Sequence, residues 1–194
     1  PLATQLATTR ASIGGRPMPL LYASDGQINA VVPYDIPINT RSQVIVQRGA
    51  SQSVPEPVTV AAAQPAVFTK DQSGKGQGLI FVAAGNNQLL ADPSAPAKSG
   101  DVLVIYCAGL GEVSPSVPAG SAAPSSPPAT TVNRVTVSIG GATVPVQFAG
   151  LSPGFAGLYQ VNAVVPAGIA PGSAVPLTLS VAGQTSPPVS MAIK

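Results

Sequence analysis

The stretch Gln27-Ile28-Asn29-Ala30-Val31-Val32-Pro33 appears again, with one substitution, as Gln160-Val161-Asn162-Ala163-Val164-Val165-Pro166. Each copy follows an Ile-Gly-Gly turn, at Ile13-Gly14-Gly15 or at Ile139-Gly140-Gly141, and precedes another run of β-forming residues. A phrase that returns between the same neighbours indicates one structural unit used twice. The repeat therefore decides the fold before any single residue is considered.

The two copies differ slightly in length. Ile13 corresponds to Ile139, an offset of 126, whereas Gln27 corresponds to Gln160, an offset of 133. The seven added residues fall around 150–157, and the later offset, from Val44–Val46 to Leu177–Leu179, is again 133. The alignment thus predicts the same strands in both copies, with a longer connection in the second.

The second copy is preceded by a strand-like apolar run, Val102–Cys107, which begins 37 residues before Ile139. The same count back from Ile13 passes the first residue, so the first copy is predicted to lack its opening strand. A sandwich short of one strand exposes unpaired backbone N–H and C=O groups. A strand from another chain would cover them, and head-to-tail pairing of this kind builds filaments. The alternative is that the missing strand belongs to an upstream segment.

Composition favours a tightly layered β protein. Hydrophobic residues make up 45% of the 194 residues and aromatic residues only 4%, and tryptophan is absent, so Val, Ile, Leu and Ala must form the core. Charged residues make up 8%, about a third of the usual share. A surface with so little charge tolerates close packing against copies of the same chain.

Charge and hydropathy exclude two classes of partner. Nine Lys and Arg residues stand against seven Asp and Glu and are scattered, with no cluster able to follow a phosphate backbone. We therefore expect no nucleic-acid partner. No apolar run approaches the length of a membrane span, and no signal peptide is recognisable at the start of the chain.

The supply of reactive side chains is small. Without histidine no Ser-His-Asp triad can form, and a single cysteine permits no internal disulfide. Cys107 lies in an apolar run and is expected to be a small buried hydrophobe. The carboxylates share no short motif: Asp25 and Asp35 are typical of solvated turns, and no spacing supplies a calcium site. We therefore predict no catalytic residue, no metal site and no cofactor, and a protein that is not an enzyme.

Turn residues recur roughly every ten residues, a rhythm typical of sandwiches and barrels. The predicted domains are a first, incomplete β-sandwich unit over 1–68, a connector with a β-hairpin over 69–99, and a second β-sandwich unit over 100–194. The connector hairpin is expected to turn at 85–87. Residues 113–131 are rich in Pro, Ser, Ala and Thr and are predicted to form an extended surface loop, which could carry O-linked sugar.

The repeated polar and proline positions are the candidate site residues. Because the Gln and the Asn of each copy are two residues apart, they share one face of a strand. If that face is inward, their amides would bond to loop backbone and hold a corner of the sandwich. A sugar-binding role is the alternative, although carbohydrate surfaces usually add aromatic residues. The candidates are Gln27, Asn29, Pro33, Gln160, Asn162 and Pro166, and the tyrosines expected in core or corner positions are Tyr22, Tyr34, Tyr106 and Tyr159.

Four stretches together carry a family resemblance: Gln27–Pro33, Gly100–Tyr106, Gly109-Leu110-Gly111 followed by Pro115, and Gly154–Asn162. They resemble the Solibacter-type uncharacterised C-terminal domain family of large secreted bacterial proteins, over nearly all of the chain. That family is similar to immunoglobulin-like modules of cell-surface proteins. The resemblance therefore implies β-sandwich modules and an extracellular or cell-surface location, and it implies no activity.

The sequence thus predicts an all-β protein of two immunoglobulin-like units, the first lacking its opening strand. The leading hypothesis is a non-catalytic extracellular subunit of a filament or surface assembly, in which the open edge of residues 8–63 accepts a strand from another copy. The donor is left open among residues 1–7, 79–90 and 191–194. The second hypothesis is a cell-surface adhesion or carbohydrate-binding module with a cell-wall glycan as partner, which an exposed aromatic row or a deep polar pocket would favour.

Overall fold

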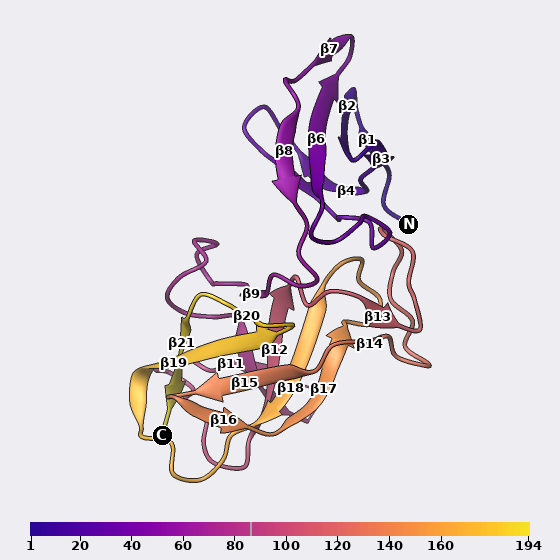
Figure 1. Cartoon of the computed structure of the whole chain (residues 1–194). Coiled ribbons are helices and arrows are strands. Elements are labelled where there is room, and N and C mark those ends of the chain that lie inside the picture. The colour runs from indigo at the N-terminus through magenta and orange to yellow at the C-terminus, as the bar shows by residue number, and fades with distance from the viewer. Residues whose placement is uncertain (86) are drawn as a thin grey trace. The chain divides into compact units, whose positions relative to one another are not determined.

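The chain folds into short strands joined by turns and loops. A computed structural model describes residues 1–85 and 87–194, and these contain no helix. Each strand runs antiparallel to its neighbours in a sheet (Figure 1). The predicted all-β fold class is therefore confirmed. The turn predicted at 85–87 includes Asn86, which lies outside the described residues.

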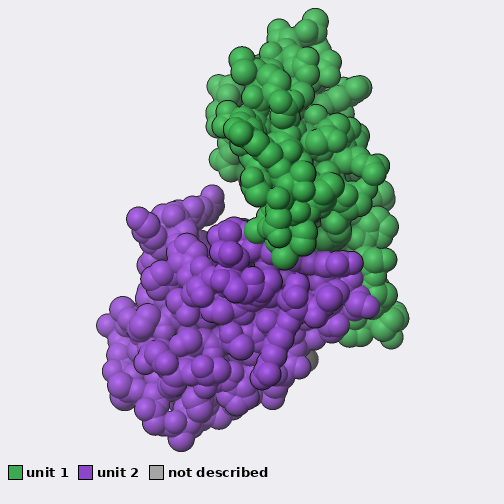
Figure 2. All heavy atoms as spheres, viewed as in Figure 1, with its two compact units in different colours: residues 1–62, 115–129, 153–157 green, residues 63–114, 130–152, 158–194 purple. Residues whose placement is uncertain are grey.

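The chain divides into two compact units (Figure 2). Unit 1 comprises residues 1–62 together with 115–129 and 153–157, and we call the last two segments the unit 1 loops. Unit 2 comprises residues 63–114, 130–152 and 158–194. The predicted boundaries, 1–68, 69–99 and 100–194, remain a prediction.

The strands of unit 1 are β1 (Gln5–Leu6), β2 (Thr9–Ile13), β3 (Arg16–Pro17), β4 (Leu20–Ala23), β5 (Ile28–Ala30), β6 (Arg41–Arg48), β7 (Ser51–Gln52) and β8 (Glu56–Thr59). One sheet has the order β1-β2-β6-β7, with β3 paired to β2 and β8 paired to β6. β4 and β5 form a separate two-stranded sheet. β2, β6 and β8 can be followed side by side in Figure 1.

The turn between β2 and β3 explains why Ile-Gly-Gly starts each repeat. Gly14 and Gly15 have φ of 54° and 78°, and Ile13 pairs with Arg16 across them. A two-residue hairpin turn of this hand needs positive φ at both central residues, which glycine adopts without strain. The hairpin predicted at this position is confirmed.

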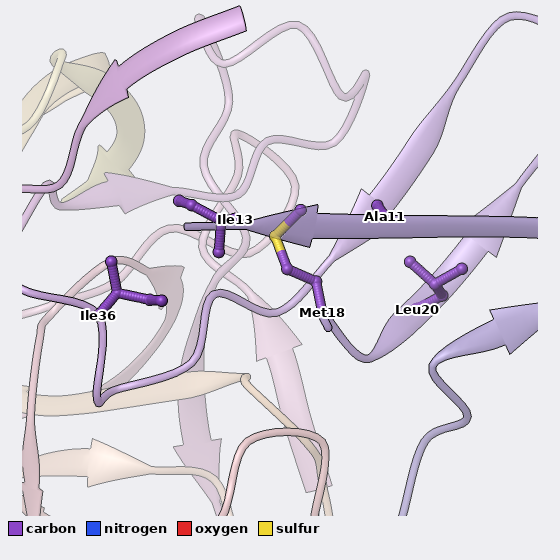
Figure 3. Packing of buried hydrophobic residues seen from close by; sticks show 5 residues of the cluster. All are labelled: Ala11, Ile13, Met18, Leu20 and Ile36. Carbon is purple, nitrogen blue, oxygen red and sulfur yellow. The ribbon is translucent and has the colours of Figure 1, made fainter. Parts of the chain in front are cut away.

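The core of unit 1 is small and aliphatic. Ala11, Ile13, Met18, Leu20 and Ile36 are its buried side chains, and Figure 3 shows them along β2, at the start of β4 and in the loop that follows β5. Seven further apolar residues pack against this cluster while remaining partly exposed: Leu6, Ile28, Ala30, Val44, Val46, Val58 and Val60. More of the apolar side chains in this unit are therefore half-buried than fully buried.

The strands of unit 2 are β9 (Ala66–Val67), β10 (Ile80–Ala84), β11 (Asn87–Leu90), β12 (Val102–Ala108), β13 (Val113–Ser114), β14 (Thr130–Thr131), β15 (Val135–Ile139), β16 (Ala142–Val144), β17 (Val146–Leu151), β18 (Tyr159–Val164), β19 (Gly172–Val181), β20 (Gln184–Thr185) and β21 (Val189–Ile193). One sheet has the order β11-β10-β12-β18-β17-β14-β13, with β9 on β12. The other has the order β16-β15-β19-β20, with β21 on β19. The hairpin predicted in the connector is β10 and β11, which extend the sheet of β12.

The core of unit 2 is more completely buried. Ile80, Leu103, Ile105, Ile139 and Leu177 have no exposed surface. Along β15 the residues alternate between buried and partly buried, as expected for a strand with one face on a core. The expectation that aliphatic side chains form the interior is therefore met.

The strand pairing of unit 1 is repeated in unit 2. Ile13 of β2 pairs with Val44 of β6, and Ile139 of β15 pairs with Leu177 of β19. These four residues carry the offsets of 126 and 133 that the sequence alignment gave. Hairpins after β6 and β19 correspond in the same way, as β7 and β20, and so do the partner strands β8 and β21.

Even an irregularity is shared by the two units. The pairing of β4 with β5 skips Leu21, and the pairing of β17 with β18 skips Gln147, 126 residues later. A β-bulge of this kind bends and twists its strand locally. β4–β5 and β17–β18 are therefore the same piece of structure, with the same register.

The prediction for residues 113–131 is wrong in one respect. The segment begins and ends in strands β13 and β14, and Val117, Ala123 and Ala129 are buried. The N–H of Ala123 donates to the C=O of Phe155 at 2.9 Å, within the unit 1 loops. Many prolines exclude a regular strand, but they do not prevent single apolar residues between them from entering a core.

Candidate functional site

In unit 2 the opening strand predicted at Val102–Cys107 is β12, and it covers one side of β18. The two strands pair over six residues, from Val102 opposite Val164 to Cys107 opposite Tyr159. Every second residue of β12 points inward, and Leu103, Ile105 and Cys107 have no exposed surface. β12 therefore supplies both backbone partners and core side chains to β18.

In unit 1 the strand that corresponds to β18 is β5, and β4 is its only partner among the described residues. The offset of 133 places Ile28, Ala30 and Val32 where Val161, Ala163 and Val165 lie in unit 2. We call the backbone groups of Ile28, Ala30 and Val32 that point away from β4 the β5 edge. This edge lies where β12 would be in a complete copy.

Hydrogen bonds on the β4 side define which residues form the β5 edge. The N–H of Ser24 donates to the C=O of Gln27 at 2.8 Å, and the N–H of Val31 donates to the C=O of Pro19 at 2.8 Å. Backbone groups of alternate residues in a strand point to opposite sides. Because the backbone groups of Gln27 and Val31 face β4, those of the alternate residues Ile28, Ala30 and Val32 face the other way.

Burial differs between the two copies at the same positions. Val165 is 1% exposed, whereas its counterpart Val32 is 44% exposed. Val161 and Ala163 have no exposed surface, whereas Ile28 and Ala30 are only partly buried. The β5 edge is therefore lined by apolar side chains as well as by unpaired backbone.

The repeated amides lie together in each unit. Gln27 Nε2 donates to Asn29 Oδ1 at 2.6 Å, and Gln160 Nε2 donates to Asn162 Oδ1 at 2.9 Å. Both pairs lie on the outer face, because the inward positions are taken by the apolar residues that alternate with them. The amides thus bond to each other, and Gln160 Oε1 also accepts from the hydroxyl of Ser152 at 3.3 Å, so the expected bonds to loop backbone are replaced by side-chain bonds.

The repeated prolines lie just beyond the two strands. Pro33 follows β5 and Pro166 follows β18, and both are half-buried. Proline has no N–H and cannot continue a ladder, so each marks the point where strand pairing stops.

Three of the four tyrosines occupy buried or half-buried positions, as expected. Tyr159 is buried and its hydroxyl donates to the C=O of Gly111. Tyr106 donates to Gln88 Oε1 at 3.2 Å and meets Phe81 edge-to-face, with ring centroids 5.8 Å apart. These contacts stabilise the sheet around β12. Tyr34, in unit 1, is half-buried.

Tyr22 departs from the prediction. It is 49% exposed and lies opposite Asn29 across the β4–β5 pair, hence on the same outer face as the Gln27–Asn29 amides. An alternating strand places every second side chain outward, and nothing in the residues around Tyr22 indicates that it is one of these. An exposed aromatic ring thus lies beside two amides in unit 1.

The remaining candidates carry no chemistry of their own. Asp25 and Asp35 are exposed, as predicted, and Asp35 Oδ2 lies 3.0 Å from Arg16 Nη2 in a pair whose side chains are both more than half exposed. Such exposed pairs contribute little to stability. Cys107 is buried as expected, and burial raises the pKa of its thiol, which keeps it protonated.

Neither a metal centre nor a membrane helix is found in the described chain. Across residues 1–85 and 87–194 no three His, Cys, Asp or Glu side chains gather as metal ligands. Within the same ranges no helix is long and apolar enough to cross a bilayer. A cavity of about 420 Å³ in unit 2 is lined by 130–136 and 143–149, and no carboxylate faces it.

Sequence reasoning missed the unit 1 loops. A Cβ on Gly120 would lie 2.6 Å from Pro19 Cβ, and one on Gly157 would lie 2.9 Å from Val31 Cγ2, with positive φ at both glycines. Only glycine permits so close an approach of these loops to the residues that flank β4 and follow β5. In the sequence, the only indication that these loops belong to unit 1 is the pair of glycines, Gly120 and Gly157.

Comparison with protein-family models, with curated proteins and with solved structures gave no match. The resemblance to the secreted bacterial family therefore stays a prediction.

Proposed function

We propose that this chain is a non-catalytic extracellular structural protein, a subunit of a filament or surface assembly. In this proposal both units are immunoglobulin-like β-sandwiches, and unit 1 is completed by a strand from a neighbouring copy placed along the β5 edge. The extracellular location rests on the family resemblance in the sequence. The assembly rests on the difference between β5 and β18.

One observation carries the proposal. The same ladder occurs twice, and among the residues that the structure describes only the second copy has a strand beyond its Gln-x-Asn strand. An unpaired apolar edge is a template for pairing with another chain, and native proteins usually blunt such an edge with charge or cover it. The β5 edge has no charged residue in it, since Ile28, Ala30 and Val32 are all apolar.

Pairing through this edge is asymmetric. The edge belongs to unit 1, and a donor strand from elsewhere in a second copy leaves that copy's own β5 edge free for a third. Heterologous contacts of this kind propagate into open filaments unless the rotation between copies closes a ring. The low surface charge offers little repulsion between successive copies.

The proposal is tested with Val32→Asp, which places a charge at the β5 edge. The matched control is Val54→Asp, the same substitution at a residue that is 87% exposed and lies outside the strands. We expect the unmodified chain and the control to assemble with rising concentration, and Val32→Asp to stay monomeric, in size-exclusion chromatography and negative-stain microscopy. A full chain that stays monomeric at every concentration would overturn the proposal, as would assembly of Val32→Asp equal to that of the control.

The exposed tyrosine supports a second candidate function, a surface module that binds glycan. Tyr22 lies across the strand pair from Asn29, which is bonded to Gln27. An aromatic ring offers an apolar face to a sugar, and free amide groups suit its hydroxyls. In unit 2 Phe148 takes the place of Tyr22 opposite Asn162, but it is half-buried and has no hydroxyl.

The glycan hypothesis is tested by pull-down of the full chain on insoluble cell-wall polysaccharide. Tyr22→Ala is expected to abolish retention, and Tyr34→Ala, at a half-buried tyrosine of the same unit, serves as the control after its fold is checked by circular dichroism. Equal retention of both variants, or no retention of the unmodified chain, would remove this candidate.

A further inference from the structure

We infer that the β5 edge accepts a strand in one particular register, which unit 2 displays within the same chain. The occupant is an extended, uncharged peptide strand that runs antiparallel to β5. It places two large apolar side chains opposite Ala30 and Ile28 and a small one opposite Gly26. This inference rests on the proposed function and specifies the partner's chemistry.

The register comes from β12 and β18. In unit 2 Leu103 lies opposite Ala163, Ile105 opposite Val161, and Cys107 opposite Tyr159. The offset of 133 carries these three positions of β18 to Ala30, Ile28 and Gly26. A donor strand therefore needs the order large, large, small at every second residue.

Two observations justify the transfer between units. The β4–β5 and β17–β18 pairs share their register and their β-bulge, so the acceptor strand has the same orientation in both. Ile28 and Ala30 already pack against the core of unit 1, so a donor side chain beside them would extend that core. A slip of one residue would turn the donor's apolar side chains outward.

The free edge strand of unit 2 does not meet this requirement. β11 is the last strand of its sheet. The N–H of Ala91 donates to the C=O of Ile80 in β10, so the backbone groups of the alternate residues Gln88 and Leu90 point to the unpaired side of β11. Pairing by that edge would place Gln88 or Leu90 opposite Ile28. The polar Gln88 would then face the core of unit 1, whereas Leu89, which is 51% exposed in unit 2, would point outward.

The C-terminal strand alternates buried apolar residues, but the third of them, Ile193, is large where the order needs a small residue, and the strand is already paired. Val189, Met191 and Ile193 are at most 4% exposed in β21, which pairs with β19. Donating it would empty the core of unit 2. Residues 1–7 are the least buried of the three segments considered, but Gln5 and Leu6 pair with β2, and the N–H of Leu2 donates to the C=O of Gly120 at 2.7 Å. Their alternate residues Leu2, Thr4 and Leu6 do not follow the order large, large, small. The partner is therefore defined by the chemistry of its strand, and none of these three segments provides it as it stands.

The test adds a second β12 to the full chain. A copy of residues 100–108, with Ala in place of Cys107, is placed ahead of Pro1 through a Gly/Ser linker of about 20 residues, which spans the connection flexibly. The register is read by disulfide formation between Asn29→Cys and a cysteine in the added copy at the position of Val104, because Val104 lies opposite Asn162 in unit 2. The mismatched control puts that cysteine at the position of Tyr106 instead, where the Cα atoms are too far apart to bridge.

We expect efficient disulfide formation for the matched pair and little for the mismatched one. We also expect about tenfold or greater slowing of amide exchange at Ile28 and Ala30 in the extended chain, and loss of assembly. A further control replaces both large apolar residues of the added copy by Ser and is expected to give no slowing.

Equal disulfide yields in the two pairs, or equal protection by the Ser-substituted strand, would overturn the register and leave the proposed assembly standing. An unextended chain that never assembles overturns the proposed function instead. The matched disulfide would then still support the register as a property of unit 1.

Discussion

β5 and β18 have nearly the same sequence and the same place in the same ladder, yet one is half-exposed and the other is enclosed. Val32 is 44% exposed and Val165 is 1% exposed, although both follow Ala-Val in identical phrases. The two strands differ in their neighbours, because β18 has β12 beside it, whereas β5 pairs with β4 alone within residues 1–85 and 87–194. A sequence phrase thus fixes strand and register, while burial depends on what the rest of the fold supplies.

The largest difference between the units is expected in amide hydrogen exchange. Ala163 is paired with Leu103 in the middle of a sheet, whereas Ala30, its counterpart, faces the open β5 edge. Core amides exchange only through extensive opening, so we expect Ala163 to exchange about 10³-fold or more slowly than Ala30 in the monomer. The measurement is exchange followed by NMR. Similar protection at both residues would mean that something already covers the edge.

The second largest difference is expected from truncating one core isoleucine in each unit. Ile105→Ala removes a side chain with no exposed surface and should lower the free energy of unfolding by about 2–5 kcal/mol. Ile28→Ala removes a partly buried one and should cost roughly half of that or less. Denaturant unfolding of each variant gives both values, with Ile105→Val at about 1 kcal/mol as the graded control. A larger cost at Ile28 would show that unit 1 has a tighter core than its exposure suggests.

A smaller difference is expected at a pair of equivalent serines. Ser53 Oγ accepts from the N–H of Val46 at 3.0 Å, and Ser186 Oγ accepts from the N–H of Leu179 at 3.0 Å. Ser186 is buried and Ser53 is exposed. Ser186→Ala should therefore cost about 1–3 kcal/mol by leaving a buried donor unpaired, whereas water can replace the hydroxyl in Ser53→Ala, which should cost about 0.5 kcal/mol. Equal losses in thermal unfolding would contradict this account.

The smallest effect is a pH dependence at one carboxyl of unit 2. Hydrogen bonds from the hydroxyl and N–H of Ser73 hold the pKa of Asp71 below its ordinary value. A carboxyl with a lowered pKa stabilises the folded loop above its unfolded pKa, and the contribution is lost as pH falls through the folded pKa. We expect the Asp71 titration, followed by NMR, to move to higher pH in Ser73→Ala. No movement would show that Ser73 does not set this pKa.

Much of the fold followed from the sequence because the repeat carries its own alignment. The offsets of 126 and 133 predicted which strands correspond, and the pairs Ile13 with Val44 and Ile139 with Leu177 confirm them. The β-bulges at Leu21 and Gln147 could not be predicted from the sequence, because a residue that is skipped in the pairing is of the same type as other strand residues. The burial of Val117 and Ala123 was also missed, since composition averages over a segment and hides single inward positions.

The candidate site could be predicted only in part. The residue count predicts that the first copy lacks an opening strand, and in the part of the chain that the structure describes β5 pairs with β4 alone. The exposure of Tyr22 depends on which face of β4 meets the core, and alternation alone does not decide that face. The bond between Gln27 and Asn29 needed side-chain positions, because two amides on one strand face can bond to each other, to loops or to water.

The strand order of the repeat has a consequence for synthesis. The chain is made from its N-terminus, so β4 and β5 leave the ribosome first, β12 follows, and β17 and β18 come last. β12 is therefore made before its partner β18. At that time β5, which has nearly the same sequence as β18, has already been made. During translation β12 thus meets β5, a competing strand, before it meets its native partner β18. During refolding of the complete chain from denaturant, β5 and β18 are both present from the start. Folding during translation and refolding from denaturant therefore begin with different strands available to pair with β12.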